Sequence, residues 1–199
     1  NDCDVLLMTA TPIPRTLTMT IYGDMDLSII REKPAARKPI KTYSKLETKI
    51  DDVLMFIKKQ IELNNQVFWV CPLIEESKKV DHTSAVKKFE YLSKIFPNNV
   101  ALLHGKTNIE DKEIILNDFL NNKFKILVST TIIEVGIDFP NANAIVIENA
   151  NKFGLSQLHQ LRGRVGRGSK QSTCILMFKS NLSCLLYTSD AADEVRRVG

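Results

Sequence analysis

The chain has 199 residues, of which 44% are hydrophobic and 25% charged, with a formal net charge of +4 at pH 7. This is the composition of a soluble globular protein, long enough for one α/β domain with a sizeable core plus parts of its neighbours. The mild positive charge permits nucleic-acid binding without requiring it. No apolar run reaches the roughly 18 residues of a membrane span, and no signal peptide is visible.

The four cysteines are Cys3, Cys71, Cys174 and Cys184. No two of them are close in sequence, which excludes the paired spacing of a zinc knuckle. Cys71 and Cys174 lie in apolar, strand-like runs and are predicted to be buried thiols. A reducing cytoplasm fits this usage best.

The N-terminal part enters an apolar strand, predicted over residues 5–8, without an initiator Met, so we expect a fragment of a longer protein. Prolines at positions 12 and 14 then exclude strand pairing and helix interior, which leaves the hydroxyls of Thr9 and Thr11 in a stiff loop. On the residues alone, a plain turn is the alternative. Residues 31–39 are charged, contain two prolines and lack apolar periodicity, and we place a domain boundary there.

From Ile40 onward, apolar strands alternate with helical patterns, which predicts a mostly parallel sheet covered by helices. Asn108 is a predicted N-cap. The predicted strands cover residues 40–43, 67–70, 100–103, 124–129, 144–147 and 173–178. The predicted helices cover residues 47–63, 85–95, 108–120 and 156–168.

Two loops at the ends of predicted strands carry candidate site residues. His104 and Gly105 precede Lys106-Thr107 and a helix, as in a phosphate-binding loop, but that loop needs another glycine where Val100 stands. We therefore expect no triphosphate loop there. Residues 130–138 follow the next strand, where α/β sheets bind ligands, so Thr130 could contact a DNA phosphate and Asp138 a ribose or an arginine. An N-cap Thr and a turn Asp are the alternative.

The stretch SQLHQLRGRVGRG, residues 156–168, is predicted to form a helix. The positions of Gln160, Arg164 and Arg167 would place them on one face, opposite the apolar face of Leu158, Leu161 and Val165.

No acidic residue lies between Lys152 and Lys170, so the arginines lack a local carboxylate and would bind an anion elsewhere. Gly163 and Gly166 suggest that another surface approaches the backbone closely. A basic, solvated helix face is the alternative.

Three motifs together resemble superfamily 2 helicases: residues 9–11, 130–138 and 160–167. Four longer sequence segments resemble, more specifically, the RecG family of branched-DNA helicases, and this resemblance covers about residues 4–178. These segments are TATPIPRTL, CPLIEES, TTIIEVGIDFPNA and ENANKFGLSQLHQLRGRVGRG.

The resemblance implies an α/β fold, the second RecA-like lobe, over residues 34–180. Residues 1–33 would end the first lobe, and residues 181–199, which match nothing in the family, would be foreign sequence. It also implies a monomer that acts on branched or duplex DNA in recombination and repair, with no membrane partner.

The resemblance also assigns roles to individual residues. A catalytic role falls to Gln160, Arg164 and Arg167, and nucleotide contacts to Gly136, Asp138, Arg164 and Arg167. Nucleic-acid contact or coupling falls to Thr9, Thr11, His104, Gly105 and Thr130, and no metal ligand is assigned.

ATP and Mg²⁺ would be held mainly by the first lobe, whose phosphate loop and acidic motif the sequence lacks, so we expect the chain alone to be inactive. A transcription-repair coupling translocase shares TATPIPRTL and QLHQLRGRVGRG and is the first alternative. A non-enzymatic nucleic-acid-binding lobe and an RNA helicase are the others.

Overall fold

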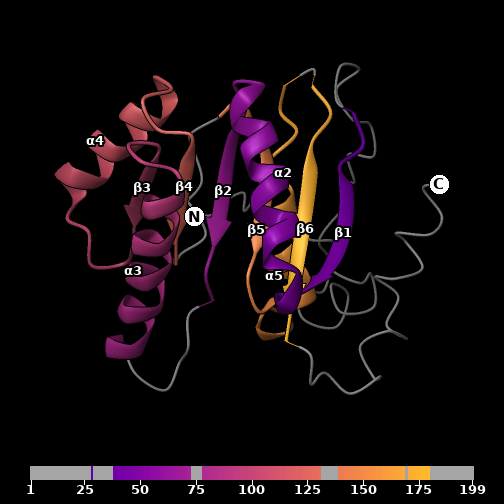
Figure 1. The fold of residues 1–199 in the computed structure, drawn as a ribbon, viewed down its shortest axis with the longest axis horizontal. Coiled ribbons are helices and arrows are strands. Elements are labelled where there is room, and N and C mark those ends of the chain that lie inside the picture. The colour runs from indigo at the N-terminus through magenta and orange to yellow at the C-terminus, as the bar shows by residue number, and fades with distance from the viewer. Residues whose placement is uncertain (1–27, 29–37, 73–77, 131–138, 169, 180–199) are drawn as a thin grey trace, which may run out of the picture. The chain divides into compact units, whose positions relative to one another are not determined.

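The computed structural model describes residues 28, 38–72, 78–130, 139–168 and 170–179 (Figure 1). The chain divides into two compact units, residues 1–35 and residues 36–199. The second unit is described below. No helix in the described ranges is both long and apolar enough to cross a membrane.

The second unit is a parallel sheet of six strands, and helices connect successive strands along most of the chain (Figure 1). The strands pair in the order β1-β6-β5-β2-β4-β3, and every pairing is parallel. All six strands predicted from Ile40 onward are therefore present, and the predicted parallel α/β fold is confirmed. The strand predicted over residues 5–8 lies outside the described residues. The strands are β1 (Lys41–Leu46), β2 (Gln66–Val70), β3 (Val100–Leu103), β4 (Ile126–Ser129), β5 (Ala142–Ile147) and β6 (Thr173–Phe178). The helices are η1 (Glu47–Lys49), α2 (Ile50–Glu62), α3 (Lys78–Ile95), α4 (Ile109–Leu120), η2 (Ala150–Lys152) and α5 (Leu155–Arg162).

Two apolar layers cover the two faces of the sheet, because successive side chains of a strand point to opposite sides. In β2, Val67 and Trp69 pack against α2 and α3, whereas Phe68 and Val70 pack against α4 and α5. Both faces are buried, which explains why Val67 to Val70 of β2 form a continuous apolar run with no polar alternation.

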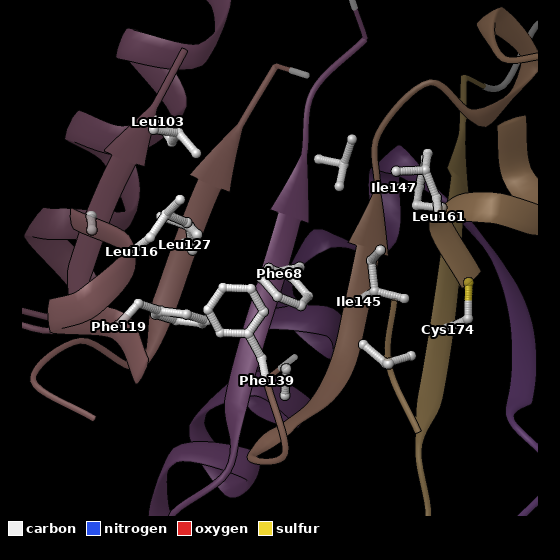
Figure 2. Packing of buried hydrophobic residues seen from close by; sticks show 14 of the residues in the cluster. Phe68, Leu103, Leu116, Phe119, Leu127, Phe139, Ile145, Ile147, Leu161 and Cys174 are labelled. Atoms are coloured by element: carbon white, nitrogen blue, oxygen red, sulfur yellow. The ribbon is translucent and has the colours of Figure 1, made fainter. Parts of the chain in front are cut away.

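Three aromatic rings hold the α4 side of the core together (Figure 2). The ring centroids of Phe68, Phe119 and Phe139 lie 5.4 to 5.5 Å apart, in tilted and edge-on pairs that suit the quadrupoles of the rings. Phe139 lies three residues before the start of β5, so this cluster anchors the chain just before that strand.

Helix boundaries differ from the sequence prediction by more than three residues at two places. Helix α3 begins at Lys78 instead of residue 85, since no proline or glycine interrupts the polar stretch before Ala85. Helix α5 ends at Arg162 instead of Gly168, for a reason given below. The predicted N-cap of α4 is confirmed, because the Asn108 side chain accepts a hydrogen bond of 2.7 Å from the Asp111 N–H.

Candidate functional site at the two edges of the sheet

The parallel sheet separates the candidate residues into two groups. Because all strands run the same way, their carboxyl ends form one edge of the sheet and their amino ends form the other. His104 directly follows β3 and Thr130 directly follows β4, so both lie at the carboxyl edge. The segment with Arg164 and Arg167 precedes β6 and lies at the amino edge.

His104 and Thr130 are neighbours, since β3 and β4 pair with Leu103 opposite Ser129. The Thr130 N–H donates to the Leu103 carbonyl at 3.4 Å, and Thr130 is buried. This pair forms the part of the carboxyl edge nearest the end strand β3.

The turn after His104 is closed by its own hydrogen bonds. The Thr107 N–H donates to the His104 carbonyl at 3.0 Å, and the His104 N–H donates to Thr107 Oγ1 at 3.2 Å. The Lys106 N–H donates to His104 Nδ1 at 3.2 Å, while Gly105 is exposed. Val100, which stands where a triphosphate loop would need a glycine, is buried in β3. The turn borders an open depression of about 410 Å³.

Two glycines bring the arginine segment against the amino edge. A Cβ added at Gly166 would meet Ile40 Cγ1 at 3.1 Å, and one added at Gly168 would meet the Pro140 carbonyl oxygen at 2.9 Å. Ile40 directly precedes β1, and Pro140 precedes β5. The close approach expected at Gly166 is therefore confirmed, whereas a Cβ added at Gly163 would meet two carbonyl oxygens of its own helix, both at 3.4 Å.

The prediction of one helical face for Gln160, Arg164 and Arg167 is wrong. Helix α5 stops at Arg162, with Gly163 as its C-cap. Gly166 then takes a left-handed backbone, with φ of 78°, which ends any helical path before Arg167. The chain must turn here because β6 starts at the same edge of the sheet. The predicted apolar side is confirmed, since Leu161 and Val165 are buried and Leu158 packs against them.

Arg164 is a half-buried cation at this edge. Its Nε atom is buried and has no hydrogen-bond partner among the described residues. Burial lowers the pKa of the Arg164 guanidinium, and the neighbouring positive charge of Arg167 lowers it further. A buried donor without a partner is unfavourable, so this position suits an anion such as a phosphate. Arg167 is exposed, and so is Gln160 on α5.

A third group of polar residues was not predicted. At the carboxyl edge, Lys88 Nζ of α3 lies 2.6 Å from Glu148 Oε1, directly after β5. The other carboxylate oxygen accepts a hydrogen bond from Cys71 Sγ at 3.6 Å. The three residues are far apart in sequence, and only the strand order brings them together. The sequence contained one signal for this group, which was the acidic residue Glu148 at the end of a buried strand.

Several predicted site residues cannot be placed. Thr9, Thr11, Gly136 and Asp138 lie outside the described residues. Within the described ranges, no group of His, Cys, Asp and Glu side chains could hold a metal ion. The thiols of Cys71 and Cys174 are free and buried, as predicted.

A six-stranded parallel sheet covered by helices on both faces is the arrangement found in RecA-like helicase lobes. The chain belongs to the family described as helicase conserved C-terminal domain, whose model matches residues 48–169.

Within that family, the chain is similar to the ATP-dependent DNA helicase RecG of several bacteria. It is 52% identical to that of Bacillus subtilis over 179 residues, and 45% identical to that of Escherichia coli O157:H7 over 180 residues. Each match covers 89% of this chain but 26% of the relative, so the chain spans about a quarter of these proteins.

Solved structures show the same fold. The structure of RecG bound to a three-way DNA junction matches with a TM-score of 0.72 and 41% identity, over 95% of this chain and 24% of that one. The second domain of the DEAD-box helicase Mss116p, bound to an RNA duplex, matches with a TM-score of 0.53 and 22% identity. That match covers 70% of this chain and 54% of the other, and it supports the fold alone.

Proposed function

We propose that this chain is the second motor lobe of an ATP-dependent DNA helicase that acts on branched DNA, such as replication forks and Holliday junctions, in recombination and repair. The observation that carries the proposal is the half-buried Arg164, whose Nε lacks a partner among the described residues at the amino edge. The similarity to RecG proteins, and to the RecG structure with a DNA junction, supports the choice of substrate.

In this proposal, Arg164 and Arg167 contact the phosphates of an ATP molecule that is bound mainly by another lobe. Guanidinium groups stabilise the negative charge that spreads over the transferring phosphoryl group. Arg164 is suited to the task because its burial strengthens the attraction, while a guanidinium keeps its proton even when its pKa is lowered. Gln160, on α5 four residues before Arg164, would lie close to these arginines.

Mg²⁺ finds no ready set of ligands among the described residues, because no three of their His, Cys, Asp and Glu side chains lie together in a way that could hold a metal ion. We therefore assign the ion to another lobe and derive no step through it. The roles of Gly136 and Asp138 at the nucleotide, and of Thr9 and Thr11 in coupling, remain predictions.

The carboxyl edge would hold the DNA backbone. Gly105 is exposed in the turn after β3, and Lys106 beside it carries an exposed positive charge. Thr130 stands at the end of the neighbouring strand. Lobe closure over ATP would tighten this grip and release after hydrolysis would loosen it, which produces translocation.

The test is steady-state ATP hydrolysis by the intact parent protein with forked DNA, linear duplex DNA, single-stranded DNA and RNA. We expect the strongest stimulation with forks or junctions. Stimulation by linear duplex alone would favour a transcription-coupled translocase, and stimulation by RNA alone an RNA helicase. A protein that binds DNA but hydrolyses no ATP would be a non-enzymatic binding lobe.

A further inference from the structure

The carboxyl edge contains a polar cluster that the proposed DNA contacts do not use. We call Glu148, Lys88, Cys71 and Trp69 the Glu148 cluster. It lies between β2 and β5, where the following helices part: α3 packs on one face of the sheet and α5 on the other. Chain connections that diverge in this way open a crevice at the carboxyl edge of a parallel sheet.

The Glu148 carboxylate has partners on two other elements. Oε1 accepts a bond of 2.6 Å from Lys88 Nζ, and the two side chains are 11% and 21% exposed. Oε2 accepts from the Cys71 thiol, whose pKa is raised by burial and by the Glu148 charge. The Lys88 ammonium also lies 5.1 Å from the centre of the Trp69 ring.

Such an ion pair fixes the relative positions of its two side chains more than it raises the free energy of unfolding. The desolvation of a half-buried ion pair offsets most of its Coulomb attraction, but loss of one partner leaves an uncompensated charge. Glu148 and Lys88 therefore fix the position of α3 relative to the end of β5.

Contacts of the Glu148 cluster also connect the carboxyl edge of the sheet with the amino edge. The Cys71 N–H donates to the Ser129 carbonyl at 2.8 Å, one residue before Thr130. On the other side, Ala150, two residues after Glu148, packs in the same core as Leu161 and Val165. A continuous path of contacts thus runs from Thr130 to the residues that flank Arg164.

We propose that Glu148 and Lys88 are positioning residues that couple DNA binding at the carboxyl edge to the arginines at the amino edge. This inference rests on the proposed function. Neither residue needs to touch DNA or nucleotide. Their ion pair keeps the carboxyl end of β5 in place. When DNA displaces the end of β4 at Thr130, Ala150 and α5 are therefore displaced as well, because local movement between them does not absorb the shift.

The test measures ATP hydrolysis by the intact parent protein with and without forked DNA, and DNA affinity by fluorescence anisotropy, for Glu148→Gln, Lys88→Met and the double variant. We expect a roughly tenfold lower DNA-stimulated kcat, as for other small displacements of catalytic groups. The DNA-free rate and the DNA affinity should stay close to those of the unsubstituted protein. The double variant should be no worse than either single one, and Lys88→Arg should retain most of the stimulation.

Asp118→Asn is the matched control, since it removes a Lys123–Asp118 contact of the same 2.6 Å length away from the carboxyl edge. It should leave the stimulation unchanged. Weaker DNA binding in Lys88→Met alone, with a smaller salt dependence, would make Lys88 a phosphate contact and overturn the inference. Equal losses of the DNA-free and DNA-stimulated rates would also overturn it, by indicating a structural role. No stimulation in the unsubstituted protein would instead overturn the proposed function and this inference with it.

Discussion

Gly168 lies against the carbonyl oxygen of Pro140, where a Cβ added at position 168 would stand only 2.9 Å away. The contact is between two backbones, so neither side can yield by rotating a side chain. It joins the arginine segment to the chain just before β5.

Gly168→Ala should therefore lower the free energy of unfolding by about 1–3 kcal/mol, the usual cost of overpacking. Urea denaturation of this chain, followed by circular dichroism, measures the change. Gly163→Ala is the control, since Gly163 has a negative φ and an added Cβ would meet no atom closer than 3.4 Å. That variant should be neutral or slightly more stable. Equal effects of the two substitutions would contradict the importance of the close contact.

Arg167→Ala in the intact parent should lower kcat for ATP hydrolysis by roughly 10³-fold, the usual effect of losing an arginine that stabilises the transferring phosphoryl group. DNA affinity should change much less, because the arginine lies at the amino edge of the sheet. The measurement is DNA-stimulated ATP hydrolysis at saturating ATP. Arg162→Ala is the control, as that side chain contacts His159 on the same helix, 3.1 Å away. An unchanged kcat in Arg167→Ala would refute the catalytic role.

The chain by itself should hydrolyse no ATP above background, with or without DNA. Val100 occupies the position where a phosphate-binding loop needs a glycine, and among the described residues no three His, Cys, Asp and Glu side chains are gathered to hold Mg²⁺. Release of inorganic phosphate by the purified 199-residue chain, compared with the intact parent, measures this. Appreciable turnover by the chain alone would mean that its own residues form a complete nucleotide site.

Stability at alkaline pH should depend on the buried thiol of Cys174. Burial raises its pKa from 9.0 to about 12, and the charge of Arg162 opposes that rise. Above pH 9 the unfolded thiol loses its proton while the folded one keeps it. The contribution of Cys174 to the free energy of unfolding should therefore be constant below that pH and fall by about 1.4 kcal/mol per pH unit between the two pKa values.

Urea denaturation of this chain at a series of pH values, with and without Cys174→Ala, isolates the contribution of that thiol. The variant should be less stable at neutral pH because of the lost packing, but its stability should fall less steeply above pH 9. Parallel pH profiles would show that Cys174 ionises as readily in the folded chain as in the unfolded one.

Local patterns were enough to predict the order of strands and helices. The run from Val67 to Val70 is apolar throughout because β2 is buried on both faces, and Asn108 caps α4 because its side chain needs only the neighbouring Asp111 N–H. The motif around Arg164 and Arg167 likewise gave the helicase family without any tertiary information. These features depend on residues close in sequence, which is why the sequence alone determined them.

Only the tertiary structure decided where those residues lie. Helical spacing placed Arg167 on one face with Gln160, but the turn into β6 and the left-handed Gly166 remove it from the helix. The strand order places His104 and Thr130 at one edge and Arg164 at the other, and it brings Lys88 to Glu148 across 60 residues of sequence. Contacts of this kind depend on how distant strands pair, and the local sequence around each residue contains no information about that pairing.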